Sequence, residues 1–207
     1  RQLIADFAFP FAKSRALSIV GHASLGDWKS QEKIDGSVFQ RDRLQVARAW
    51  VEFTRVKKSR MDGRIGISAG LDLGSATDAG DSLASRPFGD GKFTKFNADV
   101  QVATALSERV VMRLDTSAQY STKSLLAPEE FALGGSRIGR AFDFNEITGD
   151  HRVGAMLEIS YRLPDGKRGP KSVELFGFVD GGGAFRKTAW PGLPVEQQMV
   201  GPGARRR

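Results

Sequence analysis

The stretch RVGAMLEISYR, from Arg152 to Arg162, alternates residue by residue between apolar and polar side chains. Its apolar set is Val153, Ala155, Leu157, Ile159 and Tyr161. The opposite set carries charge at Arg152, Glu158 and Arg162. Successive side chains of a β-strand point to opposite faces. The stretch therefore predicts a strand with one apolar face and one charged face.

The same two-residue period recurs along the chain, and long helical periodicity is missing. It is clear in Asp62–Gly74, Phe96–Val102 and Val110–Tyr120. Less regular stretches predict further strands at Gln2–Ala12, Arg15–Leu25, Leu44–Val56, Ser172–Phe185 and Gln197–Arg206. The apolar residues of Leu44–Val56 change phase, which a β-bulge would explain. About nine strands, and an all-β fold, follow from this pattern.

Strand and loop lengths point to a membrane barrel. Arg152–Arg162 has 11 residues, against about 5 or 6 for a strand of a soluble protein. A tilted strand that crosses a bilayer needs about 9 to 11. Short connections are expected at Ser59–Met61, Leu106–Arg109 and Pro164–Pro170, and long ones at Asp27–Asp42, Gly74–Gly91 and Ser124–Gly149. This alternation is typical of antiparallel transmembrane β-barrels, although a soluble β-sandwich also alternates along its strands.

Aromatic side chains near the predicted strand ends would suit the girdles that flank the apolar band of a barrel. They are Trp28, Phe93, Tyr120, Tyr161 and Trp190.

Composition excludes several functions. The 207 residues include no Cys, which removes disulfides, thiolate metal sites and cysteine nucleophiles. The net charge of +7 is scattered among acids, so nucleic-acid binding is not expected. His22 and His151 lie far apart in the sequence, which argues against a metal cluster. No phosphate loop or catalytic constellation is present, so we expect neither an enzyme nor a cofactor.

The most specific motifs lie in Leu125–Leu163 and Val173–Phe185. An E-x-F-x-L-G-G pattern is formed by Glu129, Phe131, Leu133, Gly134 and Gly135. It is followed by Gly139-Arg140-Ala141-Phe142, the pair Gly149-Asp150, the strand acid Glu158 and the segment Phe178-Val179-Asp180-Gly181-Gly182.

Together these motifs resemble the barrel domain of two-partner-secretion translocators, the haemolysin secretion/activation proteins of the BamA-like superfamily. The resemblance implies an outer-membrane barrel with more strands than are visible here, preceded by POTRA domains. We therefore expect residues 1–207 to be a fragment of such a barrel, without the POTRA domains and the flanking strands.

The resemblance also implies that the loop around Arg140 folds into the lumen, where Arg140 meets Asp180. Glu158 is a second acid that could share Arg140, and Phe142 is the aromatic of the loop motif. A guanidinium can hold a carboxylate by two parallel hydrogen bonds. The loop and strand glycines expected to permit this approach are Gly134, Gly135, Gly139, Gly149, Gly181 and Gly182. The alternative is that Arg140 is a solvated loop residue and Asp180 a strand-end turn residue.

Ala141 departs from the family motif, because relatives usually carry a glycine at this position. If that position needs a positive φ, the Cβ of alanine would strain it.

The function that the resemblance implies is export of a large adhesin- or haemolysin-like partner protein through the outer membrane of a Gram-negative bacterium. The partners would be this secreted exoprotein and outer-membrane lipid, and the barrel would be monomeric. Two alternatives stay open: a BamA-like insertase that assembles other barrels, and a soluble β-sandwich binding module.

Overall fold

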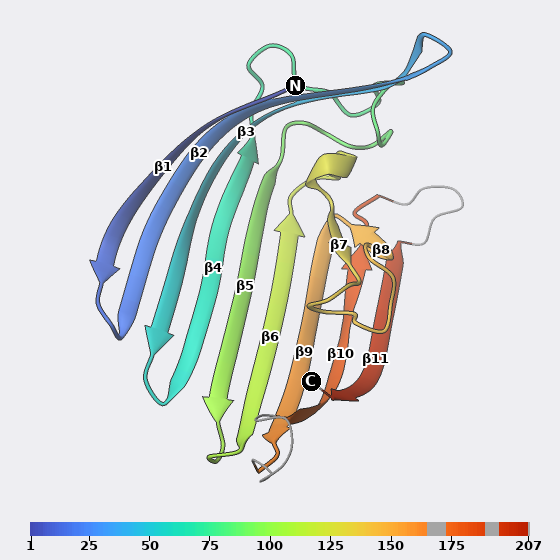
Figure 1. Ribbon diagram of the computed structural model, residues 1–207. Coiled ribbons are helices and arrows are strands. Elements are labelled where there is room, and N and C mark those ends of the chain that lie inside the picture. Colours follow the sequence, from blue (N-terminus) through green and yellow to red (C-terminus); the bar gives the residue numbers. More distant parts are fainter. Residues whose placement is uncertain (165–172, 189–194, 207) are drawn as a thin grey trace.

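The computed structural model describes residues 1–164, 173–188 and 195–206. Nine antiparallel strands form one sheet in the order β1-β2-β3-β4-β5-β6-β9-β10-β11 (Figure 1). The strands are β1 (Gln2–Lys13), β2 (Leu17–Ile34), β3 (Ser37–Val56), β4 (Ser59–Gly70), β5 (Thr94–Ala105), β6 (Val110–Ser121), β9 (His151–Arg162), β10 (Glu174–Phe185) and β11 (Glu196–Arg206). The predicted all-β antiparallel fold is confirmed. Among the described residues the sheet is open, with β1 and β11 at its two edges.

The connection between β6 and β9 contains its own small elements. These are the short 3-10 helix η1 (Ala127–Glu129) and the strands β7 (Phe131–Leu133) and β8 (Ile147–Gly149), which pair with each other. β7 and β8 contact β10, and the connection lies on one side of the sheet (Figure 1). The sequence did not predict them, because three residues are too few for a periodic pattern.

The two faces of the sheet have opposite environments. On β9 the apolar residues Val153, Leu157 and Ile159 are 56%, 37% and 48% exposed. Met156 and Glu158, on the other face, are 0% and 2% exposed. A β-sandwich would bury the apolar face, so that alternative is wrong. An exposed apolar band opposite a polar interior is the pattern of a transmembrane barrel. We call the side of Leu157 the outer face and that of Glu158 the inner face.

Strands β2 and β3 form a hairpin much longer than predicted. They pair from Leu17 and Arg55 up to Ile34 and Ser37, with a register shift between Glu32 and Lys33. The turn has positive φ at Asp35 and Gly36, as in the type I′ turns that suit hairpins. The predicted loop at Asp27–Asp42 is therefore wrong. Both faces of this segment are largely polar, so it lacks the apolar alternation that marks a strand.

The bulge expected in Leu44–Val56 is also absent. β3 pairs with β4 without a register shift from Val46 opposite Gly70 to Val56 opposite Arg60. Leu44 and Val46 point to the inner face, where they are buried with Phe93, Leu125 and Leu126. The change of apolar phase thus marks an inner patch covered by loops.

The β4–β5 loop, residues 71–93, covers the edge of β3 beyond the end of β4. Three backbone hydrogen bonds join them: Leu71 N to Gln45 O at 2.7 Å, Thr77 N to Arg43 O at 3.0 Å and Arg41 N to Leu83 O at 2.6 Å. These contacts satisfy backbone groups that would otherwise form an open strand edge.

From β3 onward the connections follow the predicted alternation. Loops 71–93 and 122–150 are long, whereas β5 and β6 are joined by the short turn at Leu106–Arg109. The β3–β4 turn lies at Lys57 and Lys58, just before the predicted position, and most of Pro164–Pro170 lies outside the described residues.

The aromatic prediction holds for two residues. Tyr120 and Tyr161 are exposed on the outer face, each near the C-terminal end of its strand. Because β6 and β9 are antiparallel, the two tyrosines lie toward opposite rims of the sheet. Phe93 is buried and Trp28 packs against the same inner cluster, so neither belongs to a girdle. Trp190 lies outside the described residues.

Candidate functional site

The β6–β9 connection is packed against the inner face of the last three strands of the sheet. Leu133, Ile138 and Ile147 from the loop are buried against side chains of β9, β10 and β11. The wall residues of this cluster are Met156, Ala184 and Met199, with Phe178 partly buried beside them. The loop therefore folds back onto the interior wall, and an apolar core holds it there.

The tip of this loop meets two buried acids. The backbone N–H groups of Gly139 and Arg140 donate to Asp180 Oδ2 at 3.0 and 2.8 Å. The Arg140 guanidinium reaches past Asp180 and donates from Nη1 to Glu158 Oε2 at 2.5 Å. Its Nε donates to the carbonyl of Ser136 at 3.0 Å. Arg140 is therefore not the solvated residue of the alternative reading.

The structure distributes these contacts differently from the expected Arg140–Asp180 fork. Glu158 accepts a hydrogen bond from the guanidinium, and Asp180 accepts hydrogen bonds from two backbone N–H groups of the loop. The register explains this, because Glu158 on β9 lies opposite Phe178 on β10, two residues from Asp180.

Glu158 is shared by two arginines. Its Oε1 accepts a hydrogen bond from Arg113 Nη1 on β6 at 2.8 Å, while Arg140 holds Oε2. The Arg140 guanidinium also lies 4.9 Å from the ring centroid of Phe178, which adds a cation–π contact. Phe178 can therefore lie on the polar inner face beside Asp180, because the loop covers the Phe178 ring.

Asp180 is only partly satisfied in this arrangement. It is 2% exposed, and its Oδ1 has no hydrogen-bond partner among the described residues. Burying a carboxylate oxygen without a donor costs free energy. The docked loop is consequently held less tightly than two fully paired acids would hold it.

Glycines shape the backbone of the loop. Gly134 and Gly139 have φ of +114° and +82°, conformations that side chains rarely adopt. A Cβ on Gly139 would also lie 2.6 Å from Met199 Sδ on β11. Gly135 has φ of +119°, and a Cβ on Gly149 would lie 2.8 Å from the carbonyl oxygen of Phe185.

The two strand glycines differ in what they permit. A Cβ on Gly182 would lie 2.9 Å from Leu133 of the loop, so this glycine allows the close approach that was expected. A Cβ on Gly181 would instead meet the carbonyl of Met199 on β11 at 2.7 Å. Gly181 therefore serves strand packing and not the loop.

The two residues after Arg140 fit against β11. Ala141 does not have a positive φ, so its Cβ causes no backbone strain. A Cβ on Gly201 would lie 2.8 Å from that of Ala141 and 3.3 Å from Phe142. Phe142 is partly buried against the loop cluster, and its N–H closes a turn onto Gly139 O at 3.0 Å.

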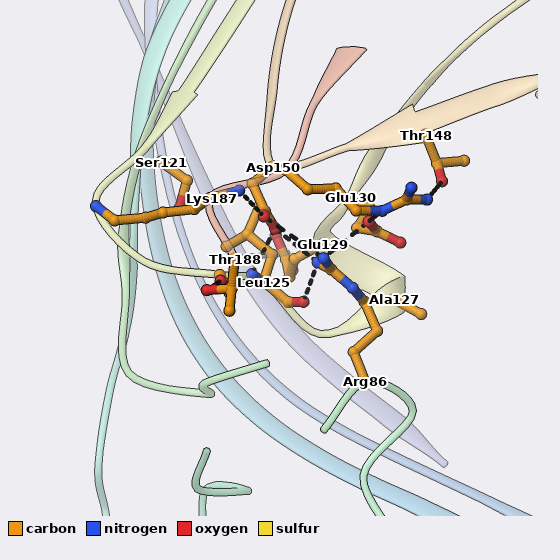
Figure 2. A network of polar contacts seen from close by, with 12 residues as sticks. Arg86, Ser121, Leu125, Ala127, Glu129, Glu130, Thr148, Asp150, Lys187 and Thr188 are labelled. Atoms are coloured by element: carbon orange, nitrogen blue, oxygen red, sulfur yellow. Dashed lines mark hydrogen bonds and ion pairs between the residues drawn. The ribbon is translucent and has the colours of Figure 1, made fainter. Parts of the chain in front are cut away.

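A second site, which the sequence analysis did not single out, lies where three long loops meet. Figure 2 shows Asp150 with Arg86, Leu125 and Lys187 converging on it. Its carboxylate, fully buried, accepts from Arg86 Nη1 at 2.6 Å, Leu125 N at 2.7 Å and Lys187 N at 2.9 Å. These donors come from the β4–β5, β6–β9 and β10–β11 connections. One carboxylate thus ties the three loops together.

Glu130 extends this network. Its Oε1 lies 3.1 Å from Arg86 Nη1 and 4.0 Å from Arg186 Nε. Burial raises the pKa of Glu130, and the nearby Arg86 opposes that rise. The Gly149-Asp150 pair is the sequence motif that marks this site, but the sequence analysis includes only Gly149 among the candidate site residues.

No described helix is long and apolar enough to cross a membrane. Within residues 1–164, 173–188 and 195–206, no group of three or more His, Cys, Asp or Glu side chains is placed to hold a metal ion.

An antiparallel sheet with an exposed apolar outer face and a loop docked on a charged inner face defines the wall of a transmembrane β-barrel. The sequence profile of haemolysin secretion/activation protein ShlB/FhaC/HecB matches residues 15–194, and the chain belongs to this family. No curated protein sequence matches it significantly.

Two solved structures share the fold. CdiB from Escherichia coli superposes with a TM-score of 0.78 at 16% identity, over 99% of this chain and 38% of that one. CdiB from Acinetobacter baumannii gives 0.72 at 19% identity, over 100% and 35%. The chain therefore spans a little over a third of the length of these two CdiB chains.

Proposed function

We propose that this chain forms part of an outer-membrane, protein-conducting barrel that exports a large adhesin- or haemolysin-like partner in a two-partner secretion system. The observation that carries the proposal is the family match over residues 15–194. The charged inner face, with an insertion docked on it through Asp180 and Glu158, supports a conducting role. The barrel would lie in the outer membrane of a Gram-negative bacterium, in contact with its lipid, as a monomer.

Residues 1–207 would be one section of a larger closed barrel, with further strands and POTRA domains in the full-length protein. An open sheet edge in lipid leaves backbone groups unpaired, at a cost of several kcal/mol for each group. Neighbouring strands beyond β1 and β11 would remove this cost.

The β6–β9 connection is the movable part in this proposal. Its tip is anchored by Asp180 and Glu158, and it covers the wall that a passing chain would contact. Export requires the tip to shift. Because Asp180 Oδ1 has no partner in the docked state, less free energy is lost when the tip leaves.

Partner export by an Arg140→Ala variant of the full-length protein tests this role. We expect reduced export, because the change leaves Glu158 with one of its two arginines and loosens the tip. Asp143→Ala is the control, since it removes an exposed charged side chain from the same loop. Undiminished export by Arg140→Ala at normal barrel abundance would remove the contact from the mechanism.

A barrel-assembly insertase is the second candidate from the same superfamily. It would act on other barrels and not on a secreted chain. The secreted proteins of a strain that lacks the full-length protein separate the two: loss of one exoprotein supports export, and a general loss of outer-membrane barrels supports an insertase.

A further inference from the structure

The inner wall holds a cavity that the docked loop tip does not use. It has a volume of about 300 Å³ and lies between β3, β4, β5, β9 and the residues around η1. Four cationic side chains line it, and only two carboxylates do. The cations are Arg48, Arg64, Lys95 and Arg152, and the carboxylates are Asp99 and Glu129.

Glu129 enters this cavity from the inserted loop and not from the wall. Its carboxylate contacts Arg48 of β3 and accepts from Lys95 Nζ of β5 at 2.7 Å. Lys95 also donates to the backbone carbonyl of Glu129 at 3.0 Å. Glu129 is 6% exposed, so the pair is shielded from water. One carboxylate of the chain itself is thus bound by two wall cations.

Of the remaining two cations, Arg152 is incompletely paired. Arg152 is 5% exposed, and its Nε has no hydrogen-bond partner among the described residues. Its Nη2 lies 3.6 Å from Asp99 Oδ1, too long for a strong charge-assisted bond. Arg64 stacks on the ring of Trp50 at 4.4 Å. A buried donor without an acceptor is costly, so the cavity favours a further anion.

We infer that this cavity binds carboxylate side chains of the polypeptide in transit, and that Glu129 occupies it as an internal substitute while the loop is docked. This inference rests on the proposed export function. When the loop shifts, Glu129 leaves Arg48 and Lys95 unpaired. An Asp or Glu of the passing chain then replaces it, so that Arg48 and Lys95 again have a carboxylate partner.

Single-channel recording on the full-length protein in a planar lipid bilayer tests the assignment. The probes are two unstructured peptides, one of repeated Glu-Gly-Ser and one of repeated Gln-Gly-Ser. Glu129→Gln removes the competing internal carboxylate. We expect it to lengthen the blockade by the Glu peptide about tenfold, because the cavity then holds no internal carboxylate in either loop state. The blockade by the Gln peptide stays the same.

Two variants control the test. Glu146→Gln removes an exposed carboxylate from the same loop and leaves both blockade times at their wild-type values. Adding Arg64→Gln to Glu129→Gln shortens the Glu-peptide blockade again. A gain of binding cannot come from misfolding, so equal blockade by the two peptides in Glu129→Gln would overturn the inference. Loss of partner export in Arg140→Ala is measured separately, so the proposed function can fail or stand independently.

Discussion

Replacing Asp150 by Ala should release the three loops that its carboxylate joins. The side chain is fully buried and accepts bonds from Arg86, Leu125 and Lys187 at 2.6 to 2.9 Å. Removing one partner of a buried, hydrogen-bonded ion pair costs about 3–5 kcal/mol. Glu130 still lies 3.1 Å from Arg86 and would keep part of the compensation. We therefore expect the lower end, about 3 kcal/mol.

Hydrogen exchange gives a direct measurement of this loss. About 3 kcal/mol corresponds to a factor of roughly 100 in an equilibrium constant. The backbone amides of Leu125 and Lys187 both donate to Asp150, so local opening of the loops exposes both. In the detergent-solubilised full-length protein we expect both amides to exchange about 100-fold faster in Asp150→Ala.

The amides of β5 are the internal reference, because their strand pairing does not involve Asp150. Asp143→Ala, which removes an exposed carboxylate from the same loop, should leave exchange at Leu125 and Lys187 at the wild-type rate. If Asp150→Ala protects these two amides as well as the wild-type protein does, the carboxylate does not couple the loops.

Three further changes follow from individual contacts. Gly139→Ala places a Cβ at φ of +82° and 2.6 Å from Met199 Sδ. This strain should cost about 1–2 kcal/mol. Because the loop then opens more often, limited proteolysis should cut loop 122–150 about tenfold faster. Leu157→Arg on the outer face should cost about 2–4 kcal/mol in a vesicle folding titration, whereas Gln101→Arg on the inner face should cost little. The pKa of Glu130 is raised by burial, so the stability gained by its neutral form is complete below the ordinary glutamate pKa and is lost as pH rises through the raised value. Thermal unfolding of Glu130→Gln should therefore match the wild-type protein at low pH and exceed it at neutral pH, and parallel pH profiles would contradict this.

The sequence predicts the strands best where an apolar outer face opposes a polar inner face. Arg152–Arg162 shows strict alternation, and β9 runs from His151 to Arg162 with that alternation in its exposure. The signal is strong because each side chain has only one of two very different environments. The inward fold of the Arg140 segment has no such signal, and its prediction depends on the resemblance to the translocator family.

Prediction failed where a strand lacks this contrast between its two faces. The upper part of the β2–β3 hairpin has polar residues on both faces, so it read as a loop around Asp35 and Gly36. Leu44 and Val46 lie on the inner face but are apolar, because loops cover them. The sequence alone also does not show which acid binds which arginine. The assignment of Glu158, and not Asp180, to the Arg140 guanidinium depends on strand register.

The convergence of three loops on Asp150 also limits how the surface of this protein can diversify. Residues beside the shared carboxylate are constrained jointly, since a change near Arg86 alters the support of Leu125 and Lys187 as well. Sites distant from Asp150, such as the exposed turn at Asp35 and Gly36, are not constrained by these shared contacts. Sequence variation among relatives should therefore accumulate at such exposed turns, while the residues around Asp150 stay nearly unchanged.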